Sequence, residues 1–195
     1  MEIVVSTFLT SQNLQMSKIS SSLKLYVDEL KDLWLANDQM ARALAKISPQ
    51  TQNPKLHLML KQSQTGIAKH TEIVKSLIEA HGEVAYKKHC SGMQGIAAET
   101  IKNTIEEAPE SGSMLDAAII AQHRRITYYG LLSFGKVWGF AKALQLADDQ
   151  TKLQSAVNEM YQSDELMRKL AESAVNMQAA LKKRVEELTG RQMGK

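Results

Sequence analysis

Residues 116–135, DAAIIAQHRRITYYGLLSFG, decide the fold class because they contain no turn signal before their end. We predict that they form one long helix. Spacings of three and four residues define one face of it, which consists of Leu115, Ile119, Gln122, Ile126, Tyr129 and Ser133. Most of that face is apolar, as in a helix that packs into a core, but polar side chains interrupt it and Gly130 lies within it. It contains no carboxylate, although Arg124 and Arg125 lie beside it.

The amino-acid composition favours a single all-α domain. The chain has 195 residues, enough for one sizeable core, and 44% of them are hydrophobic. Ala, Leu, Lys, Glu, Gln and Met are abundant, and these residues lose little conformational freedom in a helix. Prolines, which end or kink helices, number only three.

The charge and the single cysteine exclude several classes of function. The formal net charge is +3, and the only basic cluster is Lys182-Lys183-Arg184. We therefore expect no nucleic-acid partner, with DNA binding through the basic C-terminal helix as the weaker alternative. One cysteine, Cys90, cannot form an internal disulfide and is typical of a reducing cytoplasm. No apolar run approaches the roughly 20 residues that span a bilayer, so we expect no membrane partner.

The remaining helices follow from the same spacing rules. A first helix is expected to open at the serine caps of residues 20–22 and to end at Pro49. Its spacing predicts a buried face of Leu23, Tyr26, Leu30, Leu33, Asn37, Met40, Leu44 and Ile47. Further helices are expected over about 54–81, from the quoted stretch to about Leu144, and over about 150–188. A shorter helix within 87–108 is expected to face the core with Met93, Ile96, Ile101 and Ile105.

Long helices with short connections predict an antiparallel four-helix bundle with one extra short helix between helices two and three. The domain is expected to span residues 21–188, and the tail at 189–195 to be frayed. Residues 1–20 are expected to form a disordered extension. They lack the early Lys or Arg of a signal peptide, and Met16 is an alternative start.

Each long helix has a polar interruption near its middle. The interruptions fall at Asn37, at Ser63 to His70, at Gln122 to Gly130, and at Met160 to Asp164. In an antiparallel bundle these levels coincide in space. Di-iron and di-manganese bundles place one Glu on each of two helices and a Glu-x-x-His pair on each of the others. The layout therefore suggests the frame of a metal site.

Five motifs resemble those of a known family in order and spacing. They are ELKDLWLANDQMARALAK at 29–46, NPKL at 53–56, KKHCSGMQGI at 87–96, the quoted stretch, and SDELMRKLAESAVN at 163–176. Together they resemble the ferritin-like stress-protein family often called YciE/YciF, over roughly residues 23–178. The resemblance implies a ferritin-like bundle, a homodimer, and an association with bacterial stress responses.

Most positions where that family has metal-ligating side chains differ here. The resemblance places these positions on Asn37, Gly66, Thr127, Tyr128, Gly130 and Met160. Four residues remain as residual ligand candidates: His70, Glu72, Glu159 and Asp164. A dinuclear site needs several carboxylates to balance about four positive charges, so the chain is expected to have lost the centre.

We therefore expect a non-catalytic cytoplasmic protein with no catalytic residues and no cofactor, which acts through a homodimer or an unidentified protein partner. The alternative is a metalloprotein with a reduced or relocated iron or manganese site and oxidase- or catalase-like chemistry. We expect the former metal space to be filled by Trp34, Tyr128, Tyr129 and Met160. Asp164 is expected to pair with His70, Arg124 or Arg125, and Cys90 to be a buried structural thiol.

Overall fold

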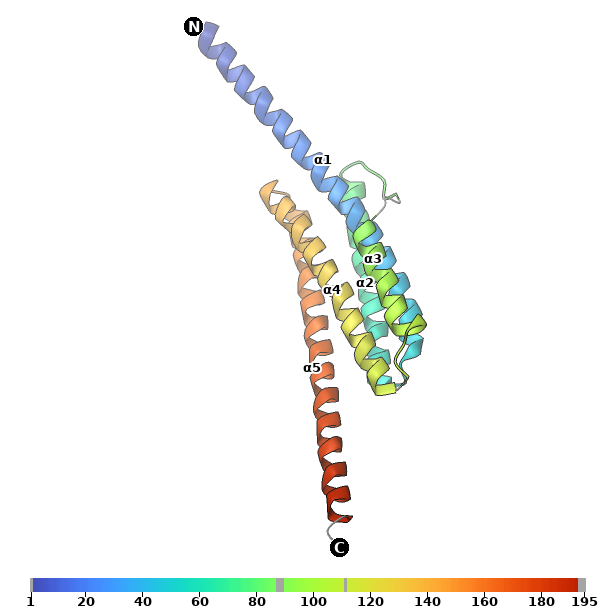
Figure 1. Cartoon of the computed structure of the whole chain (residues 1–195). Coiled ribbons are helices and arrows are strands. Elements are labelled where there is room, and N and C mark those ends of the chain that lie inside the picture. The colour runs from blue at the N-terminus through green and yellow to red at the C-terminus, as the bar shows by residue number, and fades with distance from the viewer. Residues whose placement is uncertain (1, 87–89, 111, 193–195) are drawn as a thin grey trace.

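The computed structural model describes residues 2–86, 90–110 and 112–192, with side chains from 21 to 172 within those ranges. This part of the chain contains five α-helices and no strand (Figure 1). They are α1 (Glu2–Ile47), α2 (Pro54–Ala80), α3 (Ser91–Ile101), α4 (Gly112–Ala143) and α5 (Ala147–Gln192). The predicted all-α bundle is confirmed.

The four long helices form a ring of antiparallel neighbours. The pairs α1–α2 and α4–α5 have the most extensive contacts, and α1 also packs on α4 and α2 on α5. The short helix α3 lies against α1 and α4 and returns the chain to the end of the bundle where α2 began (Figure 1). Because of this return, α4 runs parallel to α2, and every adjacent pair in the ring is antiparallel (Figure 1).

Local sequence signals fix both ends of α2. The Asn53 side chain accepts hydrogen bonds from the backbone N–H groups of Lys55 and Leu56, and Pro54 occupies the first helical position. At the other end Gly82 has a φ of 76°, a left-handed conformation that glycine adopts without a steric penalty. The expected extent of about 54–81 is therefore confirmed to within one residue.

The helix that we expected to open at residues 20–22 begins instead at Glu2, and residues 2–20 are helical rather than disordered. No Gly or Pro occurs in that segment, so nothing in its backbone stops the helix. In the same way α5 extends to Gln192, through residues that we expected to be frayed, while 193–195 lie outside the described residues. The ends of α1 and α5 project from opposite ends of the bundle (Figure 1).

The start of α5 also differs from the prediction of about 150. Asp148 and Asp149 lie in its first turn, where carboxylates interact favourably with the helix dipole. Asp149 also joins α5 to α1 and to the C-cap of α2, because its Oδ2 accepts a hydrogen bond from Tyr26 at 2.8 Å and lies 2.7 Å from Nε2 of His81. The basic cluster at 182–184 belongs to α5, beyond the last described side chain.

The chain after α3 departs from the expected helical face. Lys102–Glu106 form a π-helical turn, which rotates the following residues relative to a continuous α-helix. The buried face runs through Met93, Thr100 and Thr104, and Ile105, which we expected to face the core, is 38% exposed. That expectation was wrong because it advanced five residues from Ile96 to Ile101, whereas one face of an α-helix recurs every three or four residues.

The described side chains form two apolar core clusters. One lies around Leu44, Leu56 and Ile119, and the other around Leu30, Leu77 and Phe134. The buried face of α1 is the one that its spacing predicted: Tyr26, Leu30, Leu33, Asn37, Met40, Leu44 and Ile47. None of the described helices has the length and hydropathy needed to cross a lipid bilayer.

Candidate functional site

Polar side chains from all four long helices are buried at mid-bundle. Asn37 of α1, His70 of α2, His123 of α4 and Asp164 of α5 are each no more than 8% exposed. Uncompensated polar groups are costly in a core, so the partners of each one determine what this layer can do.

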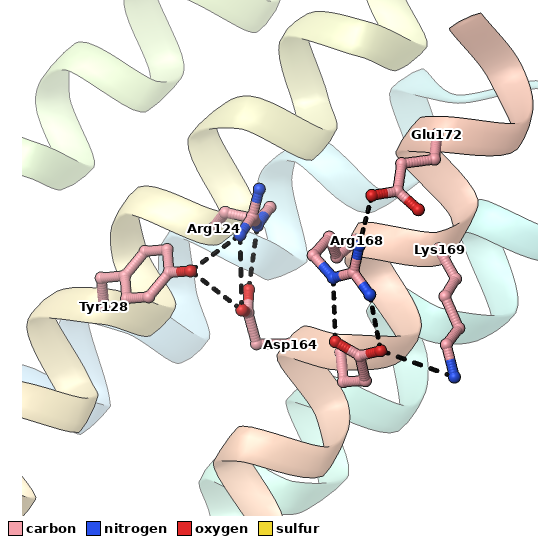
Figure 2. A network of polar contacts seen from close by, with 7 residues as sticks. Arg124, Tyr128, Asp164, Arg168, Lys169 and Glu172 are labelled. Carbon is pink, nitrogen blue, oxygen red and sulfur yellow. Dashed lines mark hydrogen bonds and ion pairs between the residues drawn. The ribbon is translucent and has the colours of Figure 1, made fainter. Parts of the chain in front are cut away.

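Asp164 is held by two residues of α4. Arg124 donates from Nε to Asp164 Oδ1 at 3.0 Å and from Nη2 to Oδ2 at 3.4 Å, while the Tyr128 hydroxyl donates to Oδ2 at 3.1 Å (Figure 2). Arg124 Nη2 lies 2.7 Å from the same hydroxyl oxygen, which closes the network. The hydrogen bond to Asp164 raises the pKa of Arg124. Of the three partners that we expected for Asp164, the structure selects Arg124.

A second set of ion pairs lies further along α5 (Figure 2). Arg168 bridges Glu165 and Glu172, and Lys169 lies 3.5 Å from Glu165. All four side chains are at least 41% exposed, so solvent screens their interactions and each pair contributes little to stability. The Arg124–Asp164 pair, with a buried carboxylate and a partly buried guanidinium group, is the one with structural consequences.

Glu159 is the other carboxylate at this level, and it too is paired within the chain. Lys69 Nζ donates to its Oε1 at 2.7 Å, and His70 Nε2 lies 3.2 Å from its Oε2. The hydrogen bond from Lys69 lowers the pKa of Glu159, and burial lowers the pKa of His70. His70 and Glu159 are thus brought together as residual ligand candidates, whereas Glu72 lies on the exposed face of α2.

His123 was missed by the sequence reasoning, which placed Gln122 on the buried face instead. The structure buries both, because α4 packs against the bundle and is also covered by α3, where Thr100 donates to Gln122 at 3.4 Å. His123 Nε2 lies 2.9 Å from Ser63 Oγ, and burial lowers the pKa of His123 to about 4. Its position four residues after Ile119 was the available signal.

Asn37 occupies the α1 position of the layer and is 1% exposed. Within the part of the chain that the structure describes, neither its Oδ1 nor its Nδ2 has a hydrogen-bond partner, and His123 Nδ1 also lacks one. A buried unsatisfied polar group costs about 1–3 kcal/mol, so this layer is not optimised for stability.

A cavity of about 290 Å³ adjoins the layer. It corrects our expectation that four large side chains fill this space. Its lining includes Met160, but Tyr128 is 45% exposed, and Tyr129 packs instead over Gly92. Trp34 lies beside both apolar clusters, away from the cavity lining.

The two glycines at the level of the polar layer, Gly66 of α2 and Gly130 of α4, differ in their surroundings. A Cβ atom on Gly130 would lie 2.7 Å from Cε of Met160 and 3.4 Å from Sδ of Met40, so methionines cover that gap. A Cβ atom on Gly66 would meet nothing within 4 Å, and Gly66 lines the cavity. Of these two positions, only Gly130 has packed neighbours.

We predict that Gly66→Ala raises the free energy of unfolding by about 0.5–1 kcal/mol, because alanine favours the helix and meets no neighbour. Gly130→Ala is expected to give no gain, because Met160 must leave its position. Urea denaturation of both variants measures the difference. Equal stabilisation by the two substitutions would contradict the packing described for Gly130.

Cys90 is buried as expected, with 3% of its surface exposed. Its Sγ lies 3.3 Å from the Tyr129 hydroxyl and 3.7 Å from Asp32 Oδ2. These contacts fix the start of α3 against α1 and α4. Among the described residues, no group of three or more His, Cys, Asp or Glu side chains is arranged to hold a metal ion.

Comparisons with known proteins agree with this architecture. Residues 21–180 match the family described as a domain of unknown function, DUF892. Protein YciF of Escherichia coli strain K12 is 28% identical over 159 residues, which cover 80% of this chain and 93% of that protein.

Two solved structures share the fold. The crystal structure of the E. coli stress protein YciF has a TM-score of 0.74 and 24% identity, over 80% of this chain and 97% of that one. YcfI of Rhodopseudomonas palustris, named provisionally as a structural protein, has a TM-score of 0.71 and 23% identity, over 75% and 92% of the two chains.

Proposed function

The chain belongs to the family of the domain of unknown function DUF892, and on that premise we propose that it is a non-catalytic, stress-associated helix bundle without a di-iron or di-manganese centre. The family expected from the sequence motifs is thereby confirmed. The names of two relatives, a stress protein and a protein provisionally called structural, support a role in association rather than catalysis.

One observation is the main support for this proposal: the carboxylates at mid-bundle are neutralised by cations of the same chain. Asp164 pairs with Arg124, and Glu159 pairs with Lys69. A dinuclear centre needs several carboxylates whose charge is free to balance about four positive charges. The guanidinium group of Arg124 instead brings a positive charge to this level. The residues present therefore do not fit a dinuclear centre.

We further propose that the protein acts in the cytoplasm as a homodimer or with an unidentified protein partner. Large apolar side chains on the outer surfaces of α4 and α5 support association. These are Tyr128, Leu132, Tyr161 and Leu166, which are 45–76% exposed. Exposed apolar patches of this kind often mark interaction surfaces.

A metalloprotein with a reduced site is the alternative, and one contact favours it. His70 Nε2 and Glu159 Oε2 lie 3.2 Å apart, and both residues line the cavity together with His123. Imidazole and carboxylate groups are ligands that suit iron and manganese. In this case the charge of Lys69 would have to be displaced from Glu159 before an ion could bind.

Metal analysis decides between these functions. We expect protein purified without chelator, from cells grown with added iron and manganese, to contain less than roughly one tenth of a metal ion per chain. One to two ions per chain would overturn the proposal. The matched control is His70→Gln combined with Glu159→Gln, which would remove an ion held at the alternative site. The Arg125→Ala variant should leave the metal content unchanged in either case, because Arg125 pairs with Glu99 rather than with the layer.

A further inference from the structure

The cavity beside the polar layer opens between α2 and α5. Its exposed lining residues are Gln62 on α2 and Gln162 and Leu166 on α5, so the mouth lies between these two helices. From there it extends to Ile126 and Thr127 on α4 and to a single residue of α1, Met40. The volume of about 290 Å³ is therefore accessible to a ligand from solvent without a change in helix packing.

One part of the cavity wall is apolar and deformable. It is formed by Met40, Ile67, Ile126 and Met160. Methionine thioethers adapt to irregular shapes and make favourable contacts with aromatic rings. An aromatic body is consequently a better occupant of this part than a chain of water molecules.

The other part of the wall contains polar groups whose charges are already compensated. Ser63 Oγ lies 2.9 Å from His123 Nε2, and the Thr127 hydroxyl donates to the His123 carbonyl oxygen at 3.0 Å. The one carboxylate, Glu159, is paired with Lys69. Among the residues that line the cavity, no unpaired charge is available for a charged ligand. The hydroxyl oxygens of Ser63 and Thr127 and the partly exposed carboxylate of Glu159 can accept a hydrogen bond from one neutral donor.

No close contact with a neighbouring helix requires a glycine at position 66, where the cavity lies. The chain fills the gap above Gly130 with two methionines, but it leaves the space beside Gly66 open. A glycine within a helix is unfavourable, and here no neighbouring atom requires it. A ligand that occupies the cavity would account for the open space.

The size of the cavity sets the size of the ligand. Enclosed apolar cavities of about 150 Å³ bind benzene, and this open cavity of about 290 Å³ has room for one small aromatic molecule. We propose that this cavity is a binding site for a small uncharged aromatic molecule with one hydroxyl or ring N–H group, between phenol and indole in size. The proposal concerns the metal-free protein and goes beyond the associating role proposed above.

The test is isothermal titration of the full chain with phenol and with indole. We expect saturable binding of one molecule per chain, with a dissociation constant of about 1 mM or tighter. Gly66→Leu places a side chain into the cavity and is expected to weaken binding at least tenfold. Gly135→Leu is the matched control: Gly135 lies on α4 outside the cavity lining, its Cβ atom would also meet nothing, and binding should be unchanged.

Several results would overturn the inference. These are the absence of saturable binding of both probes, equal affinity of the Gly66→Leu variant, and an equal loss in the Gly135→Leu control. Binding of benzoate as tight as that of phenol would contradict the assignment of an uncharged ligand. If Gly66→Leu fails to fold by circular dichroism, Ser63→Val tests the same site, because it removes one hydroxyl from the wall. Metal-free protein that binds neither probe would refute this inference and leave the proposed function standing.

Discussion

Arg124→Ala is expected to lower the free energy of unfolding by about 3 kcal/mol. The substitution leaves the Asp164 carboxylate, whose side chain is 11% exposed, with the Tyr128 hydroxyl as its only remaining partner in the network. Breaking a buried pair typically costs about 3–5 kcal/mol, and the 29% exposure of the Arg124 side chain places this one at the lower end. Urea denaturation at neutral pH measures the loss.

The neighbouring arginine provides the matched control. Arg125 pairs with Glu99, but their side chains are 48% and 51% exposed, so Arg125→Ala is expected to cost no more than about 0.5 kcal/mol. Adding Asp164→Asn to Arg124→Ala should recover part of the loss, because the amide removes the unpaired buried charge. Equal effects of the two arginine variants would show that Arg124 is not needed to compensate Asp164.

The second large effect is a loss of stability in acid that depends on His123. Burial lowers the pKa of His123 from 6.5 to about 4, so the folded state holds it neutral in a pH range where the unfolded chain is protonated. The unfolded state therefore binds more protons between pH 6.5 and 4, and the free energy of unfolding falls as the pH is lowered through this window. The full loss is of order 3 kcal/mol and is complete below the folded-state pKa.

His123→Gln isolates this contribution. The glutamine does not titrate, so the stability difference between wild type and variant should shrink as the pH is lowered from 6.5 to 4. Carboxylates titrate in the same range, but they are common to both proteins and cancel in the difference. Parallel curves of unfolding free energy against pH would contradict a buried neutral His123.

Much of the fold could be predicted because helices are determined by local spacing. The apolar repeat of α1 predicted a buried face that the structure reproduces from Tyr26 to Ile47. The signals at Asn53 and Gly82 fixed both ends of α2, because capping depends on residues within one turn of each other. The predicted start of α1 at residues 20–22 was wrong. Serines favour a helix start, but they do not prevent a helix from continuing through them.

The candidate site was less predictable because side-chain direction and the choice between partners depend on how helices are rotated and aligned. Asp164 had three possible partners, and only the register of α4 against α5 selects Arg124. The burial of His123 arises from contacts on two sides of α4, which no single helical stripe represents. Neither Tyr128 nor Tyr129 lines the space that we expected them to fill.

The sequence by itself determined the all-α class, the buried faces of the long helices and the level at which polar residues interrupt them, since these follow from residue type and a period of 3.6. Tertiary structure alone decided that the carboxylates of this level are neutralised by Arg124 and Lys69, and that a cavity remains open beside Gly66. The physical reason is that hydrogen bonds and packing between helices depend on distances of a few tenths of an ångström. These distances are set by the mutual arrangement of helices that are far apart in the chain.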